Sequence, residues 1–442
     1  MSFNKFQRLL HQVWSEINSS YWFIPSLMSL LGILLSFLMV YIDNKISVEE
    51  INVFIWSFSL QPEGARIFLS TIASSMITVA GVTFSMTLLS VSHASSQIGP
   101  RILTGFMEDK GNQVTLGTFI TTFLYSLLVL VNIKNQNSTE AEFFVPNFSI
   151  LVAIILCLAS ILVLIYFINH VPKMISMTLA VERLGDNLLL GIYRIYPEEK
   201  EMDPKTVADI ELPKDFETNS MKVSTDKKGY VKKIMYENLI KLAKDKGLIL
   251  KSLVTPGDFV CTGFDVMEVY PQSKVNEEIK NTIHELITCG GQRTDREDLL
   301  FSVDLLIEVA ARALSPGVND PYTAVECINQ LQAGLIELSH RAQGCKNYYD
   351  DDGELRLLSS PSSFEDLVIH IYERLGHYTR SDFIGSKGVF DSLVFLEEKI
   401  TCSKKKEGLR HQQVELYNSC KQYLGKTEVI SIFGNTFTAS MN

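Results

Sequence analysis

The chain has 442 residues, which is enough for two or three domains that each bury a core. Its formal net charge of −10 argues against nucleic acid as a partner, because binding a phosphate backbone requires a concentrated basic surface. Apolar side chains crowd residues 21–169, whereas residues 170–442 carry most of the charge. This asymmetry indicates a membrane part followed by a soluble part.

The N-terminus is polar and lacks the compact apolar core and small-residue cleavage site of a signal peptide. We therefore expect residues 1–20 to form a cytoplasmic amphipathic segment and the first apolar stretch to remain in the membrane. The seven cysteines are odd in number and include no C-x-x-C pair. This favours a reducing, cytoplasmic setting over a disulfide framework.

Four apolar stretches follow, each close to the roughly 20 residues that cross a bilayer as a helix. They predict a four-helix transmembrane domain over residues 21–170, with spans near 21–42, 66–93, 114–133 and 148–168. Trp22 opens the first span at the depth typical of interfacial aromatic anchors. His93 and Arg101 follow the second span, where they would contact anionic lipid headgroups or serve as simple anchors.

Lysine and arginine near the span ends predict the orientation of the chain. They lie before span one, between spans two and three and after span four: Lys5, Arg8, Arg101, Lys110, Lys173 and Arg183. The loops on the opposite side contain more acidic than basic residues. We therefore expect a multi-pass protein of the bacterial inner membrane with both termini in the cytoplasm and with membrane lipids around it.

The second span is unusual because small and hydroxyl-bearing residues recur along it. They follow steps near 3.5 and so share one helix face: Ser70, Ser74, Thr78, Gly81, Ser85 and Ser92. Such a face either lets neighbouring helices approach closely or lines a water-filled path. A weakly selective pore requires no charged ring, so both interpretations remain open.

The soluble half divides into three predicted parts. Residues 171–217 predict a juxtamembrane helix and linker, whose apolar stripe packs against the soluble domain or against the same helix of another subunit. Residues 218–272 predict a small β-barrel-like module, with a hairpin around 226–229 and a turn at 255–258. Lys227 would lie at the hairpin tip, but its neighbours depart from a lipoylation context, which favours a structural docking module.

Residues 273–442 predict a helical cytoplasmic domain with a weak strand-like stretch at 427–433. Asp320 is a strong helix N-cap because Pro321 follows it at the first helical position. Charged and polar residues around it form either an internal ion-pair network or a ligand pocket: Arg293, Arg296, Asp304, Glu308, Arg312, Asn319 and Asp320.

Recognised catalytic and nucleotide-binding motifs are missing from the sequence, including G-x-x-x-x-G-K-[ST], G-x-G-x-x-G after a strand, H-E-x-x-H and G-x-S-x-G. The eight histidines are scattered, and none has a Cys or His at metal-ligand spacing. We therefore expect no enzyme activity, no cofactor and no metal.

Several long motifs together resemble one family. WFIP opens span one, ARIFLSTIASSMITVAGVTFSMTLLSVSHASSQIGPRIL covers span two, and RALSPGVNDPYTA lies in the soluble half. This combination resembles the bacterial membrane-protein family called domain of unknown function 2254 over essentially the whole chain. The resemblance implies the fold and membrane topology, and it implies no particular reaction or substrate.

The leading functional hypothesis is a homo-oligomeric channel-like or permeation protein. Span two would line the path, and the cytoplasmic domain would regulate it, with a small ligand or ion as a further partner. The alternative is a non-conducting membrane-anchored scaffold or sensor that binds a cytoplasmic ligand or partner. Architecture alone supports both, and it is a weak basis for function.

Overall fold

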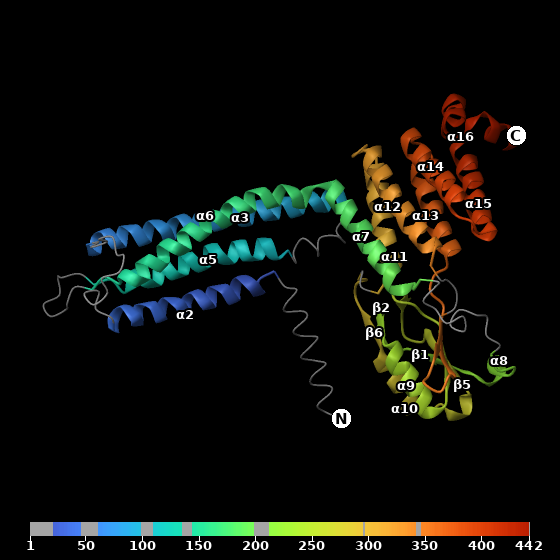
Figure 1. Cartoon of the computed structure of the whole chain (residues 1–442), viewed down its shortest axis with the longest axis horizontal. Helices are drawn as coiled ribbons and strands as arrows, with labels where there is room; N and C mark the ends of the chain where they lie inside the picture. The colour runs from blue at the N-terminus through green and yellow to red at the C-terminus, as the bar shows by residue number, and fades with distance from the viewer. Residues whose placement is uncertain are drawn as a thin grey trace. The chain divides into compact units, whose positions relative to one another are not determined.

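The computed structural model describes residues 21–45, 61–98, 109–134, 144–198, 212–294, 297–341 and 346–441. It divides into two compact units, Met1–Ser176 and Met177–Asn442 (Figure 1). The first unit contains the apolar helices, and the second combines sheets with further helices.

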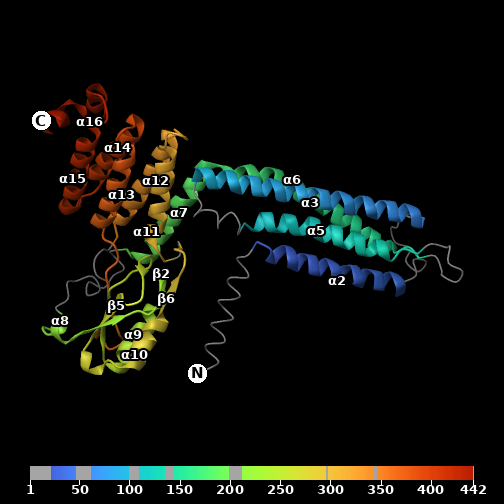
Figure 2. The same ribbon diagram turned by 180° about the vertical axis from the view of Figure 1, so that it is seen from behind.

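Four helices in the first unit are long and apolar enough to cross a membrane. They are α2 (Phe23–Lys45), α3 (Pro62–Ile98), α5 (Lys110–Val131) and α6 (Asn147–Ile175). They run alongside one another in both views of the chain (Figure 2). The predicted four spans are therefore confirmed as four candidate membrane helices.

Helix α5 is the central helix of this unit, since it packs against α2, α3 and α6. Its inward side chains include polar groups that bond to neighbouring helices. The Tyr125 hydroxyl donates to the Ser149 carbonyl at 3.0 Å, and the Thr122 and Ser160 hydroxyls lie 3.0 Å apart. These bonds satisfy polar groups that burial would otherwise penalise.

Helix α7 (Met177–Ile195) begins the second unit and buries its apolar face against α11 (Leu299–Ala313) and α12 (Pro321–Ser339). The crossing with α12 is close at Gly334, where an added Cβ would lie 2.7 Å from Leu188 Cδ2. The predicted stripe therefore packs within the second unit of its own chain, which is one of the two alternatives that its periodicity left open.

Two open sheets lie in the second unit. The five-stranded sheet has the order β1-β5-β3-β8-β7, with β3 parallel to β8 and the other pairs antiparallel. The three-stranded antiparallel sheet has the order β4-β2-β6. The strands are β1 (Met221–Ser224), β2 (Gly229–Ile234), β3 (Ile249–Ser252), β4 (Phe259–Val260), β5 (Asp265–Tyr270), β6 (Ile287–Gly290), β7 (Lys346–Tyr349) and β8 (Leu355–Ser359).

The predicted barrel-like module and its hairpin are wrong. Within the described residues no closed barrel forms, and β1 and β2 belong to different sheets. The segment between β1 and β2 packs near the end of α10 and the start of β6, because the ammonium of Lys227 donates to the carbonyls of His284 and Ile287 there. Strands β7 and β8 come from the part of the chain predicted to be helical, and β8 pairs with β3.

The remaining helices surround these sheets or form the C-terminal part of the second unit. They are α8 (Phe216–Asn219), η5 (Gln272–Lys274), α9 (Tyr236–Lys246), α10 (Glu277–Leu286), α13 (Phe364–Thr379), α14 (Phe383–Lys399), α15 (Ser403–Cys420) and α16 (Lys426–Met441). The strand-like stretch at 427–433 is helical in α16. Val429, Ile432 and Phe433 are buried, and their steps of three and one place them on one helix face.

Candidate functional site

The small-polar stripe of α3 lies on the outside of the four-helix unit. All six residues are exposed in the single chain: Ser70, Ser74, Thr78, Gly81, Ser85 and Ser92. The buried face of α3 is formed instead by Ala65, Leu69, Ile72, Met76, Ala80 and Thr83. At about 100° per residue, the two sets lie on opposite sides of the helix. The stripe is therefore not the surface that packs α3 within its own chain.

The hydroxyls on this side of α3 donate to their own helix. Thr78 Oγ1 donates to the Ser74 carbonyl at 2.7 Å, and Ser74 Oγ donates to the Thr71 carbonyl at 3.2 Å. Each hydroxyl oxygen keeps acceptor capacity toward its surroundings. The stripe thus presents small side chains and hydrogen-bond acceptors at membrane depth, where polar groups are stabilised by water or protein.

Two of the three predicted interfacial residues lie within the described part of the chain, and both are exposed. The Trp22 side chain is 61% exposed, His93 is exposed, and Arg101 lies outside the described residues. A nearby polar contact was not predicted: His170 Nε2 lies 3.1 Å from Asp109 Oδ1, and the Tyr166 ring stacks on His170. Asp109 also caps α5, and an aspartate just before an apolar helix is the sequence signal that could have pointed to this contact.

A partly buried charge network lies in the second unit, and Arg293 is its centre. Its guanidinium contacts the Asp298 carboxylate at 2.6 and 2.9 Å and the Asp304 carboxylate at 2.6 Å. His370 Nε2 lies 2.6 Å from the other Asp304 oxygen. Burial raises the pKa of Asp304, but hydrogen bonds from His370 and Arg293 outweigh it and hold this pKa below its ordinary value. Asp298 is the N-cap of α11, so the network fixes the start of that helix.

The other predicted residues of the second unit do not join this network. Arg312 pairs with Glu308 at 3.2 Å within α11, and Arg296 lies outside the described residues. Asp320 caps α12, since its carboxylate accepts from the Thr323 amide at 3.2 Å and from the Thr323 hydroxyl at 2.6 Å. Asn319 is exposed and adopts a left-handed φ of 51° just before this cap. These positions are consistent with a helix turn, and a ligand role for them stays a prediction.

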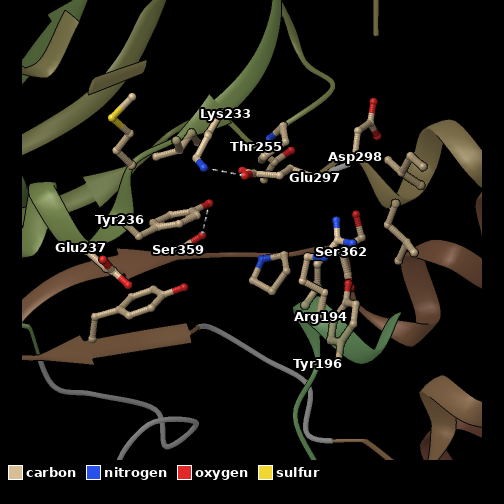
Figure 3. A pocket seen from close by; sticks show the side chains of 18 of the residues that line it. Arg194, Tyr196, Lys233, Tyr236, Glu237, Thr255, Glu297, Asp298, Ser359 and Ser362 are labelled. Carbon is tan, nitrogen blue, oxygen red and sulfur yellow. Dashed lines mark hydrogen bonds and ion pairs between the residues drawn. The ribbon is translucent and has the colours of Figure 1, made fainter. Parts of the chain in front are cut away.

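The second unit contains a cavity of about 640 Å³ that the sequence did not predict (Figure 3). Its walls come from the end of α7, the β2–α9 junction, the turn at 255–256, the start of α11 and the segment after β8. None of the predicted pocket residues that the structure describes lines it, although Arg293 holds the lining residue Asp298. The wall segments are far apart in the sequence, so only the tertiary structure brings them together.

Among the described residues no cluster of three or more His, Cys, Asp or Glu is placed to hold a metal ion.

The thiol of Cys402 is expected to be alkylated at lower pH than an ordinary cysteine. It is exposed at the N-cap of α15, where the backbone amides of Lys405 and Lys404 lower its pKa below the ordinary value of a thiol. The rate of iodoacetamide labelling, followed by peptide mass spectrometry across pH, measures this. A pH profile that superimposes on that of N-acetylcysteine would contradict the expectation, and Cys402→Ser verifies the labelled peptide.

Comparison with known proteins identifies relatives of the chain. Uncharacterized proteins of Mycobacterium bovis and Mycobacterium tuberculosis are 29% identical to it over 306 residues. The matched region covers 67% of this chain and 57% of each relative, so the match spans little more than half the length of these relatives. No solved structure matches the chain. The sequence pattern of the family described as predicted membrane protein, domain of unknown function 2254, matches residues 18–392, and the chain belongs to this family.

Proposed function

We propose that the protein is a homo-oligomeric permeation protein of the bacterial inner membrane, in which α3 from several copies lines a shared path. The soluble unit and both termini lie in the cytoplasm in this proposal, as the lysines and arginines near the span ends favour. The soluble unit regulates the path.

One observation supports this proposal more than any other: the small-polar stripe of α3 faces away from its own bundle. A lipid-facing helix surface is usually apolar, because hydrocarbon offers no hydrogen bonds. The outward face of α6 follows that rule with Leu151, Ile155, Leu158 and Leu162, each at least 50% exposed. The outward face of α3 instead carries Ser70, Ser74, Thr78, Gly81 and Ser85, with the exposed apolar side chains of Ile67 and Leu89 beside them. A second copy and water are the surroundings that suit such a face.

Replacing Ser74 with leucine is expected to reduce conductance severalfold when the purified protein is reconstituted in planar bilayers in KCl. The larger apolar side chain would narrow and dry the path at that level. Ser75→Leu is the matched control, since it makes the same change one residue further along, about 100° around the helix. Size-exclusion chromatography checks that assembly is unchanged.

Three results would contradict the permeation proposal. The wild-type protein does not conduct, Ser74→Leu conducts as the wild type does, or Ser75→Leu reduces conductance equally. The first of these would favour the second candidate function, a membrane-anchored sensor or scaffold. The observation that favours a sensor is the cavity of about 640 Å³, a size typical of small-molecule sites.

A further inference from the structure

The cavity in the second unit has walls held in place by contacts between lining residues and by Arg341. The Tyr196 hydroxyl donates to the Ser362 carbonyl at 2.6 Å, and the Tyr196 carbonyl accepts from Arg341 at 2.7 Å. The rings of Tyr236 and Tyr348 stack with centroids 5.4 Å apart. Figure 3 shows Lys233 and Glu297 along one side and Arg194 and Tyr196 on the opposite side. A ligand would therefore meet a largely preformed site, which reduces the entropy cost of binding.

The charged side chains that line the cavity nearly cancel once the pairing of Asp298 with Arg293 is included. Arg194 and Lys233 are cationic, and Glu237, Glu297 and Asp298 are acidic. The carboxylate of Asp298 is already neutralised from behind by Arg293, at 2.6 and 2.9 Å. Two cations and two carboxylates remain, so the lining is close to neutral overall. Such a lining disfavours a nucleotide or another polyanion, because its phosphates would lie near the carboxylates.

Lys233 and Glu297 form an ion pair that a ligand could open. Their charged atoms are 3.4 Å apart, and their side chains are 57% and 27% exposed. An exposed pair of this kind contributes little to stability, typically about 0–1 kcal/mol. A ligand that offers both a carboxylate and an ammonium group could pair its carboxylate with Lys233 and its ammonium with Glu297, so that each side chain would keep an oppositely charged partner. A ligand with one charge would leave the other partner without compensation.

The rest of the lining is largely apolar. Ile195, Met235, Pro256, Leu299 and Pro361 supply side chains from five separate segments. Burial of apolar ligand surface against such walls is the main source of affinity in small-molecule sites. The chemistry of the walls therefore calls for an apolar body as well as paired charges.

We propose that this cavity binds a small zwitterion with an apolar body, of the amino-acid type, with its carboxylate at Lys233 and its ammonium at Glu297. The proposal names a ligand class for the sensor function and does not depend on permeation. Binding is measured without any flux, so failure of one proposal is distinguishable from failure of the other.

The test uses the full-length protein in detergent and the twenty standard amino acids as probes in a thermal-shift screen. At least one apolar amino acid is expected to raise the melting temperature saturably. Its N-acetyl form and its amide, which each lack one charge, are expected to bind at least about tenfold more weakly. Isothermal titration then gives the affinities, where a tenfold change corresponds to about 1.4 kcal/mol.

Lys233→Met and Glu297→Gln are each expected to weaken binding about tenfold, since each removes one charged partner. Lys222→Met is the matched control, because Lys222 is exposed on β1 and lies outside the cavity lining. Melting of the variants without ligand checks that they fold. The proposal is overturned if no amino acid binds, if the singly charged forms bind equally well, or if the two cavity variants retain wild-type affinity.

Discussion

Replacing Arg293 with methionine is expected to destabilise the protein by about 3 kcal/mol, because it leaves the Asp298 carboxylate without its counter-ion and removes one of the two partners of Asp304. The Asp298 side chain is 4% exposed, so water cannot replace the guanidinium there. Removing one partner of a buried pair typically costs about 3–5 kcal/mol, and the 21% exposure of Asp304 favours the lower end. The melting temperature of the full-length protein in detergent measures the effect.

Arg312→Met is the matched control for this prediction. It makes the same substitution in the same unit, but its partner Glu308 lies one turn away on α11 and the Arg312 side chain is 37% exposed. Helix pairs of this kind contribute about 0.3–0.5 kcal/mol. Equal melting temperatures for the two variants would show that the Arg293 network does not hold the start of α11.

Replacing Gly257 with alanine is expected to cost stability for two reasons. The backbone at Gly257 has a φ of +101°, which side chains of L-residues rarely adopt. An added Cβ would also lie 2.4 Å from Asp298 Oδ2 and 2.5 Å from its Cγ. Asp298 is a short side chain held by Arg293, so it cannot move aside freely.

Gly263→Ala separates these two causes. Gly263 has a similar φ of +90°, but nothing lies within 4 Å of an added Cβ. Gly257→Ala is therefore expected to be more destabilising than Gly263→Ala by about 1–3 kcal/mol, the usual cost of overpacking. Chemical or thermal unfolding of both variants measures the difference. Equal losses would mean that the contact between the turn and Asp298 contributes nothing.

The membrane helices could be predicted from the sequence because their signal is local. An apolar run of sufficient length is enough to recognise a span, as at 148–168, which lies within α6. The N-cap of α12 was recognisable for the same reason, since Asp320 and Pro321 are adjacent in sequence. The family resemblance was confirmed over residues 18–392.

The sheets could not be predicted because their pairing is long-range. Nothing near Met221 indicates that β1 pairs with β5 rather than with β2, and β8 joins β3 across about a hundred residues. The cavity escaped prediction for a related reason, since Tyr196, Lys233 and Ser362 meet only in the folded unit. Helical periodicity placed the α3 stripe on one face, but it could not show that this face points away from the bundle.

The most direct test of the permeation proposal is a cryo-EM reconstruction of the full-length protein in lipid nanodiscs. The proposal predicts a ring of copies in which Ser70, Ser74, Thr78 and Ser85 surround an axial path wide enough for water. A monomer, or an assembly in which this face of α3 contacts lipid or is packed against another helix without a path, would contradict it.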